Sequence, residues 1–420
     1  MKKKFKSACY RFINADGITV VIAAIIIFCG ICLGIQQGKE SPEIVDWTIF
    51  GAIIIAMLLE TGTKLIREPV LNYFEDDVKL TTDYKQLVKR YKSDVISCKN
   101  QTASAENIKK AAHMGRSITA TEKFPVTCEY KLGSQPIEIR DSEEMYELPE
   151  FVKKHFDELF GAHVTSEIYN QLNIRVSRWG NEKDGFVIET SRTTYYYSLV
   201  TNRAMDFKWS NGVTVREQYE FGPFLNPLEK SSLSNHLGMN GFVESKDGQI
   251  VFVKRGKNLS IGKGTYGDSV GASLKAKYAI NENGRFTSGG LLRGIVNEIE
   301  DELKIPGEVL EIKALENMLI AAYRDLVEGG KPQLLFYAKS RWTKDEIEAN
   351  FFKKNEKKNN KNSVVEDGNK LLWIPKNELS EMCIFSDGMI HHGQFYPMMP
   401  SASASVVMLI EWLQERPEEQ

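Results

Sequence analysis

The chain has 420 residues, of which 26% are charged and 42% hydrophobic, and its formal net charge at pH 7 is −2. This length allows two or three domains, and a charge so close to neutral gives no reason to expect direct DNA or RNA binding. None of the six cysteines lies at metal-site spacing from a histidine, so we expect reduced thiols and no disulfide framework.

The first feature along the chain is a pair of apolar segments. Residues 18–35 carry no charge and would form a helix of about 27 Å, close to the hydrocarbon thickness of a bilayer. A second apolar run, 47–59, follows a short polar connection. We therefore expect two transmembrane helices, at about 18–36 and 45–63, in a hairpin over residues 1–68. A cleaved signal peptide is the alternative, but the first run is longer than usual for one.

Residues inside and around this hairpin predict its topology and packing. Five basic residues precede the first run and two follow the second, which places both termini in the cytoplasm by the positive-inside rule. Small residues allow close helix contact, although glycine is also simply common in membrane helices. Glu60 is either an interfacial residue, which we favour, or a functional group within the bilayer. The packing candidates are Gly30, Gly34, Gly51, Ala52, Ala56 and Glu60.

Two further segments follow. Residues 69–149 are expected to be a helical stalk and linker, because apolar residues recur at helical spacing over 65–95 and the segment 99–123 is polar. Residues 150–420 are expected to form a ligand-sensing domain. Apolar and polar residues alternate there, which predicts strands at 173–179, 185–190, 193–200 and 214–221. A turn at 246–249 then precedes a strand that ends in Lys254 and Arg255.

An acidic helix follows at residues 289–305, between two glycines and a proline. Glu298, Asp301 and Glu302 are spaced i, i+3 and i+4, so they share one face of this helix. Three carboxylates on one face repel one another unless a cation faces them, and their spacing suits Mg²⁺. An ordinary solvated acidic helix face is the alternative, and spacing alone favours it.

The motif resembles the second half of a Nudix signature, in which Arg-Glu is followed by further glutamates and a glycine. Glu298 and Glu302 match family carboxylates that hold Mg²⁺, and Asp301 stands for the third. The similarity covers about residues 235–415. Asn297, Lys304 and Gly289 replace the arginine, the glycine and the first glutamate of the signature. We therefore expect weak or absent hydrolysis, with a pocket kept for binding, and no required cofactor unless Mg²⁺ binding is retained.

A phosphorylated ligand in such a pocket needs cations for its phosphates and aromatic faces for its bases. Arg255 is the best basic candidate because it follows the strand directly. Ordinary strand packing is the alternative for the tyrosines. The candidates are Arg255, Lys254, Tyr195, Tyr196, Arg192, Arg203 and Arg216.

The whole arrangement resembles the two-transmembrane Nudix effectors of CBASS, the bacterial cyclic-oligonucleotide antiphage systems. The resemblance implies two N-terminal transmembrane α-helices plus a cytosolic α/β (α+β) Nudix-like sandwich, located in the bacterial inner membrane as a multi-pass protein. It implies that a partner nucleotidyltransferase makes a cyclic di- or trinucleotide. Binding of this ligand would drive homo-oligomerisation, disruption of the lipid bilayer, cell death and abortive phage infection.

Two other functions stay open. A membrane-tethered Nudix hydrolase of nucleotide or lipid diphosphates predicts metal-dependent turnover that needs Glu298 and Glu302. A membrane-anchored scaffold predicts no nucleotide binding at all. We lean away from an enzyme because the metal set is incomplete. His391 and His392 are interpreted as a structural or surface pair, since adjacent residues on a strand point apart and no cysteine or further histidine accompanies them.

Overall fold

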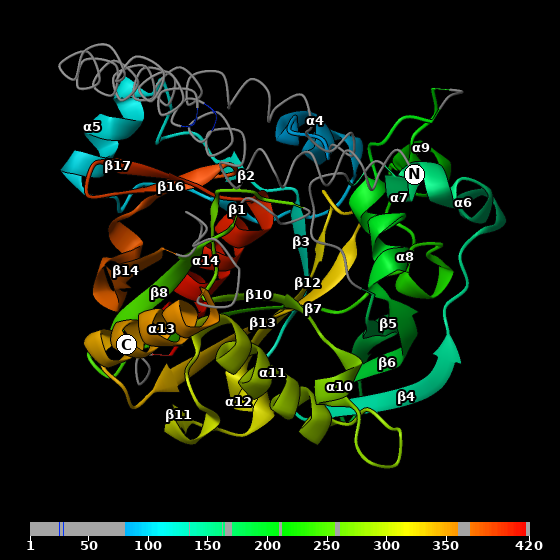
Figure 1. Cartoon of the computed structure of the whole chain (residues 1–420). Coiled ribbons are helices and arrows are strands. Elements are labelled where there is room, and N and C mark those ends of the chain that lie inside the picture. The colour runs from blue at the N-terminus through cyan, green and yellow to red at the C-terminus, as the bar shows by residue number, and fades with distance from the viewer. Residues whose placement is uncertain are drawn as a thin grey trace, which may run out of the picture. The chain divides into compact units, whose positions relative to one another are not determined.

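The structure is a computed structural model that describes residues 80–133, 135–161, 163, 170–209, 212–256, 261–359 and 370–416, together with Ile25 and Phe28 (Figure 1). The chain divides into two units, Met1–Asp77 with Gly161–Ser166 and Val78–Phe160 with Glu167–Gln420. Nearly all described residues belong to the second unit, which is a mixed α+β structure.

A nine-stranded mixed sheet organises this second unit. Its main path runs β14–β8–β7–β13–β12–β3, and β9, β10 and β11 pair with β8, β7 and β13. β7 and β13 are parallel, with Met239 opposite Leu334, and the other pairs are antiparallel. The strands are β3 (Val126–Lys131), β7 (Gly238–Glu244), β8 (Gln249–Lys254), β9 (Tyr266–Gly267), β10 (Val270–Ser273), β11 (Leu310–Glu311), β12 (Leu319–Asp325), β13 (Lys331–Ser340) and β14 (Leu371–Pro375).

Smaller sheets accompany it. One has the order β4–β6–β5, with β4 (Ile137–Met145), β5 (Leu172–Glu182) and β6 (Gly185–Thr194). Another is the meander of β15 (Cys383–Phe385), β16 (Gly388–His391) and β17 (Gln394–Pro397). A third pairs β1 (Ser97–Cys98) with β2 (Glu122–Lys123).

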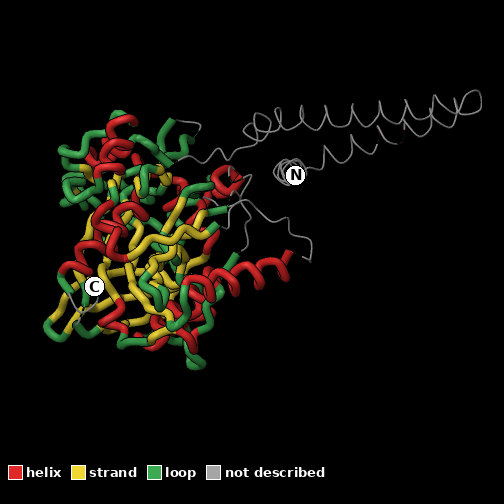
Figure 2. Tube along the Cα trace, turned by 90° about the vertical axis from the view of Figure 1, so that its left-hand side faces the viewer, coloured by secondary structure: helices red, strands yellow, loops and turns green. Residues whose placement is uncertain are grey.

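Helices lie between and around the strands, as the trace in Figure 2 shows. The α-helices are α4 (Tyr84–Arg90), α5 (Ala105–His113), α6 (Glu150–Lys154), α7 (Phe156–Gly161), α8 (Tyr195–Leu199), α9 (Val215–Tyr219), α10 (Ala276–Ala279), α11 (Ser288–Leu303), α12 (Leu315–Met318), α13 (Lys344–Asn359) and α14 (Pro400–Gln414). The 3-10 helices are η1 (Asn202–Ala204), η2 (Leu228–Lys230), η3 (Gly307–Val309) and η4 (Lys376–Glu381).

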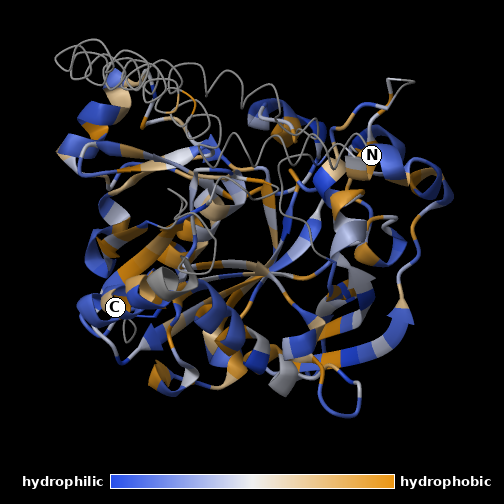
Figure 3. Ribbon diagram, in the orientation of Figure 1, coloured by the Kyte–Doolittle hydropathy of each residue, from blue (hydrophilic) through white to orange (hydrophobic). Residues whose placement is uncertain are grey.

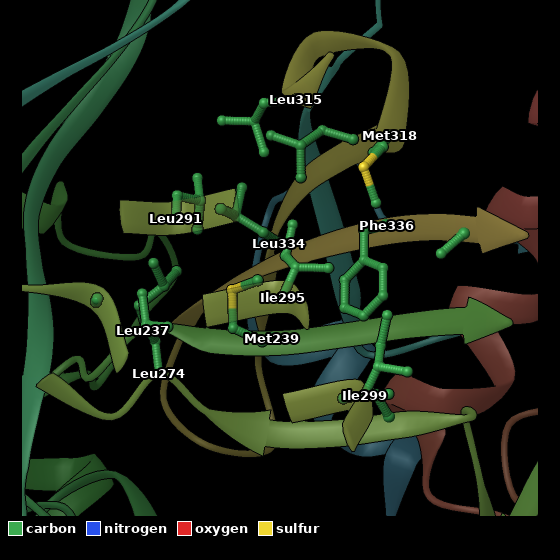
Figure 4. Packing of buried hydrophobic residues seen from close by; sticks show 14 of the residues in the cluster. Leu237, Met239, Leu274, Leu291, Ile295, Ile299, Leu315, Met318, Leu334 and Phe336 are labelled. Atoms are coloured by element: carbon green, nitrogen blue, oxygen red, sulfur yellow. The ribbon is translucent and has the colours of Figure 1, made fainter. Parts of the chain in front are cut away.

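The central sheet carries a hydrophobic core on each face, because successive side chains of a strand point to opposite sides. On β13, Leu334 and Phe336 join one core, whereas Leu335 and Tyr337 join the other. The first core includes the buried side of α11, and Figure 4 shows Leu291, Ile295 and Ile299 packed near β7 and β13. The second core contains most of α14. Figure 3 shows the hydrophobic residues on these central strands in orange.

The ends of α11 position its carboxylates. Thr287 caps the helix by accepting a hydrogen bond from the Gly290 amide at 3.2 Å. Lys304 caps the C-terminus of the helix, with a left-handed φ of 62° and an N–H that donates to the Glu300 carbonyl. Glycine is the residue that adopts positive φ most readily.

The structure corrects the expected fold class and location. Of the residues that the structure describes, none belongs to a helix long and apolar enough to cross a membrane. The longest described helices, α11 and α13, have 16 residues each and reach about 24 Å, short of a hydrocarbon core of about 30 Å. The prediction of a two-transmembrane, multi-pass inner-membrane protein is therefore wrong, and the described fold is mixed α+β.

The segments on which that prediction rested, about 18–36 and 45–63, lie outside the described residues apart from Ile25 and Phe28. The proposed packing residues lie outside them as well; these are Gly30, Gly34, Gly51, Ala52, Ala56 and Glu60.

Two expected strands are helices for a local reason. β6 ends at Thr194, whose side chain accepts from the Tyr197 amide and starts α8. Thr214 and Glu217 form a capping box that starts α9. The stretch 69–149, expected to be a helical linker, contains β3, which is the edge strand of the central sheet.

Candidate functional site

A cavity of about 400 Å³ opens where β8, β9 and β10 meet the first turn of α14. Arg203 of η1, Lys331 and Gln333 of β13 and Glu302 of α11 complete its wall. Five of the predicted site residues line it, namely Arg255, Lys254, Tyr195, Arg203 and Glu302. Segments far apart in the sequence thus meet at one cavity, and its volume falls within the range of small-molecule sites.

Arg255 is held in this wall by backbone bonds and by close glycines. Its N–H donates to the Thr265 carbonyl at 2.8 Å, and its carbonyl accepts from the Gly264 amide at 3.0 Å. A Cβ on Gly262 would lie 3.1 Å from the Arg255 Nε, and one on Gly271 would lie 3.2 Å from Nη1. Larger residues at either position would have to push the guanidinium aside.

The charge of Arg255 is incompletely neutralised by the protein. Its Nε is buried and has no hydrogen-bond partner among the described residues. Burial, and then the nearby positive charge of Arg203, lower the pKa of Arg255 below its usual range, and the acidic groups around it do not make up the difference. A buried cation in this condition favours an anionic ligand.

A second group of charges shares one carboxylate. Glu328 Oε2 lies 3.5 Å from Arg203 Nε, and Glu328 Oε1 lies 3.4 Å from Lys331 Nζ. Burial is the main cause that lowers the pKa of Lys331, with the charge of Arg203 acting in the same direction. Tyr195 accepts from Arg203 Nη1 at 3.0 Å and contacts the same guanidinium with its ring.

The remaining wall strengthens the preference for negative charge. Described residues lining the cavity include five basic side chains against three acidic ones; these are Arg203, Lys254, Arg255, Lys275 and Lys331 against Asp268, Glu302 and Glu328. Burial raises the pKa of Asp268 well above its usual range, which disfavours the charged form of this carboxyl. Ser401 and Ala402 bring the N-terminus of α14, the positive end of its dipole, to the cavity.

The acidic face of α11 has an internal counterion. Lys275 Nζ lies 2.8 Å from Glu298 Oε2 and 2.8 Å from Asp301 Oδ2, and the Tyr278 hydroxyl donates to Asp301 at 2.6 Å. Burial raises the pKa of Glu298 to about 7, against the opposing effect of Lys275. Burial also pushes the pKa of Asp301 upward, but the bonds from Lys275 and Tyr278 outweigh it and lower that pKa.

Mg²⁺, which the Nudix resemblance implies at these carboxylates, does not fit this donor set. Lys275 lies between two of the three oxygen ligands, in the place that a cation would need. Glu302 alone of the three lines the cavity. Burial of the Glu302 carboxylate raises its pKa, and the positive charge of Arg255 opposes this shift. One carboxylate falls short of the multiple oxygen ligands that the expected magnesium site requires.

Three predicted ligand residues have other partners. Arg192 pairs with Asp141 through two bonds of 2.6 Å, and both side chains are buried. Arg216 makes a bidentate pair with Asp206 and also donates to the Leu326 and Val327 carbonyls. Tyr196 packs its ring against Phe160, with centroids 4.7 Å apart. None of these three lines the cavity, and their contacts support the fold instead.

Several residues that line the cavity were not predicted from the sequence. Lys331 and Gln333 are two apart on β13, so they share the face that points into the cavity. Two polar residues spaced two apart at the start of an otherwise apolar strand are a pattern from which they could have been predicted. Lys275 and Asp268 flank β10 and gave no comparable signal, because their role depends on contacts distant in the sequence.

Comparison of the chain with protein-family models and with curated proteins finds no match.

Proposed function

We propose that this cavity binds a phosphorylated nucleotide, and that the protein senses the ligand without hydrolysing it efficiently. The observation that carries the proposal is the set of cations at the cavity, above all Arg255, whose buried guanidinium is not fully paired by the described residues. Phosphate oxygens in the cavity would pair with this guanidinium, and bonds between a guanidinium and phosphate are among the stronger hydrogen bonds in proteins.

Two further features favour a nucleotide over a small inorganic anion. Tyr195 and Tyr266 line the cavity and offer aromatic faces on which a base can stack. The ring of Tyr266 is itself supported, edge to face, by Tyr396 at a centroid separation of 5.3 Å. The cavity of about 400 Å³ is also larger than a single phosphate needs.

The case against efficient hydrolysis rests on Lys275. A Nudix hydrolase needs its carboxylates to hold Mg²⁺ against the phosphates, but here Lys275 already bridges Glu298 and Asp301. The rival function, a Nudix hydrolase, draws its support from Glu302, which faces the cavity together with Arg255.

The ligand class and the biological role follow from the sequence resemblance alone. On that basis the ligand is a cyclic di- or trinucleotide made by a partner nucleotidyltransferase, and the protein acts in bacterial antiviral defence. The cavity lies towards the lower end of the usual volume range, so it fits one nucleotide unit of such a ligand more readily than the entire ring.

The test is thermal stabilisation of the full chain by a panel of cyclic di- and trinucleotides, with linear nucleoside diphosphates and Mg²⁺ for comparison. A ligand present at 100 times its Kd stabilises the native state by about 2.7 kcal/mol. We expect a shift with one cyclic nucleotide that Arg255→Gln abolishes. Arg140→Gln is the matched control, because Arg140 pairs with Glu138 and Glu182 away from the cavity wall.

A shift given only by linear diphosphates with Mg²⁺, accompanied by cleavage, would replace the sensor with the hydrolase. No shift with any nucleotide, or a shift that Arg255→Gln leaves intact, would reject the cavity as the nucleotide site.

A further inference from the structure

The turn between β16 and β17 brings together three side chains with metal-binding atoms. His391 ends β16, His392 and Gly393 form the turn, and Glu378 projects from η4. Glu378 Oε2 lies 2.8 Å from His391 Nε2 and 3.0 Å from His392 Nε2. These three make up the one group of histidine, cysteine or acidic residues with metal-site spacing in the described part of the chain.

Backbone geometry explains how adjacent histidines converge, which contradicts the sequence-based expectation that they point apart. His392 has φ of 43° and Gly393 has φ of 63°, the pair of left-handed residues that a type I′ hairpin turn requires. His392 therefore belongs to the turn and not to a strand, so the alternation of side chains along β16 ends at His391. The two imidazole rings lie with centroids 4.0 Å apart.

The spacing of the three atoms suits a metal ion. Zinc is bound at about 2.0–2.1 Å by imidazole nitrogen and at about 2.0–2.2 Å by carboxylate oxygen, so two ligands of one ion lie about 3.0–3.4 Å apart. The separations of 2.8 and 3.0 Å between Glu378 and the two rings need only a small expansion. All the ligand atoms lie within 4.8 Å of one another.

The site combines rigid support with an open side. The His391 side chain is 6% exposed, whereas that of His392 is 68% exposed, so an ion can enter past His392. A hydrogen bond to a neighbouring helix fixes the position of the turn: the Gly393 amide donates to Asn107 Oδ1 of α5 at 3.0 Å. Ile390 packs below it in a small buried cluster with Cys383 and Phe385.

We propose that Glu378, His391 and His392 bind a divalent transition-metal ion of the zinc class. Two imidazoles and one carboxylate select borderline ions such as Zn²⁺ or Co²⁺ over Mg²⁺ and Ca²⁺. Three protein ligands leave at least one coordination position for water or a further ligand. The bound ion would link η4 to the β16–β17 hairpin in place of the direct contacts of Glu378 with the two rings.

The experiment uses the full chain, without a histidine tag and stripped of metal with EDTA, titrated with Zn²⁺ and with Co²⁺. We expect one equivalent of Zn²⁺ to bind and to raise the unfolding midpoint. One equivalent of Co²⁺ should give visible absorption bands typical of a low-symmetry nitrogen and oxygen site. Excess Mg²⁺ should produce neither effect.

His392→Asn is the decisive variant, because asparagine before glycine is favoured in a type I′ turn and tolerates positive φ. The metal-free variant should unfold at the same midpoint as the wild type or higher, yet bind Zn²⁺ at least tenfold more weakly. Glu378→Gln should weaken binding similarly. His113→Ala is the matched control, since it removes an exposed histidine at the end of α5 that lies outside the cluster.

Equal Zn²⁺ affinity in the wild type and His392→Asn would overturn the proposal, and so would an equal loss in His113→Ala. Failure of the wild-type chain to bind one equivalent of Zn²⁺ would show that the cluster is a hydrogen-bonded turn only.

Discussion

Arg255 and Arg216 test the distinction between a ligand-binding cation and a structural one. Both were expected from the sequence to contact ligand. Arg216 is 1% exposed and fully paired, with Asp206 at 2.7 and 2.9 Å and two backbone carbonyls at 2.8 Å. Arg255 has a buried Nε without a partner among the described residues. Replacing each by methionine keeps the apolar stem and removes the charge.

The two replacements should have opposite effects on the metal-free, ligand-free protein. Arg216→Met breaks a buried pair and leaves Asp206 and two carbonyls without their donor, which costs about 3–5 kcal/mol of unfolding free energy. Arg255→Met removes a buried, unsatisfied donor, whose penalty is about 1–3 kcal/mol, so stability should stay level or rise by up to that amount. The two variants should therefore differ by at least about 3 kcal/mol.

Urea unfolding of the full chain, followed by circular dichroism, measures this difference. The midpoint of Arg255→Met should equal or exceed that of the wild type, while the midpoint of Arg216→Met should fall. If Arg255→Met lost as much stability as Arg216→Met, Arg255 would be a structural residue and not the cation of an anion site at the cavity.

Three further predictions concern the fold around the site. Burial raises the pKa of Glu298 from the ordinary value of 4.5 to about 7 in the folded protein. Protonation of Glu298 therefore stabilises the folded state fully below pH 4.5, and this stabilisation is lost as the pH rises through about 7. The loss is about 3 kcal/mol, and pH-dependent unfolding should show a flatter profile in Glu298→Gln. Lys304→Gly should raise the unfolding free energy by about 1 kcal/mol, because Lys304 has φ of 62°; an unchanged midpoint in urea would contradict this. Gly241→Ala should cost about 1–3 kcal/mol, since its Cβ would clash with the Phe336 ring. Gly289→Ala, whose Cβ would make only ordinary van der Waals contacts, should be neutral or stabilising by the same measurement.

The strands and the acidic helix were predictable because each is encoded by a short-range pattern of apolar, polar and turn residues. Period-two alternation located β5 and β8, and the turn at 246–249 located the hairpin between β7 and β8. The start of α8 was missed because Thr194 acts as an N-cap within a run of tyrosines that favours a strand. The membrane fold class was wrong because it rested on the hydropathy of two segments, and no described helix has the required length and apolarity.

The site was only partly predictable. Arg255 was a candidate because it directly follows a recognisable strand, and it lines the cavity. Arg192 and Arg216 pair with carboxylates that are 51 and 10 residues away in the sequence, and such pairing cannot be read from composition. The role of Lys275 was hidden for the same reason. The sequence interpretation placed Mg²⁺ opposite the carboxylates of α11, and the cation that the structure places against Glu298 and Asp301 is Lys275. The convergence of His391 and His392 depends on a type I′ turn, and the dipeptide His-Gly is not a typical sequence signature of that turn.

Isothermal titration can show whether the cavity binds a nucleotide and leaves it intact. The full chain is titrated with the cyclic nucleotide that gives the largest thermal shift, and the recovered ligand is analysed by chromatography. We expect saturable binding, at least tenfold weaker in Arg255→Gln than in Arg140→Gln, and recovery of unchanged ligand with or without Mg²⁺. Mg²⁺-dependent conversion of the ligand, abolished by Glu302→Gln, would contradict it and establish a hydrolase.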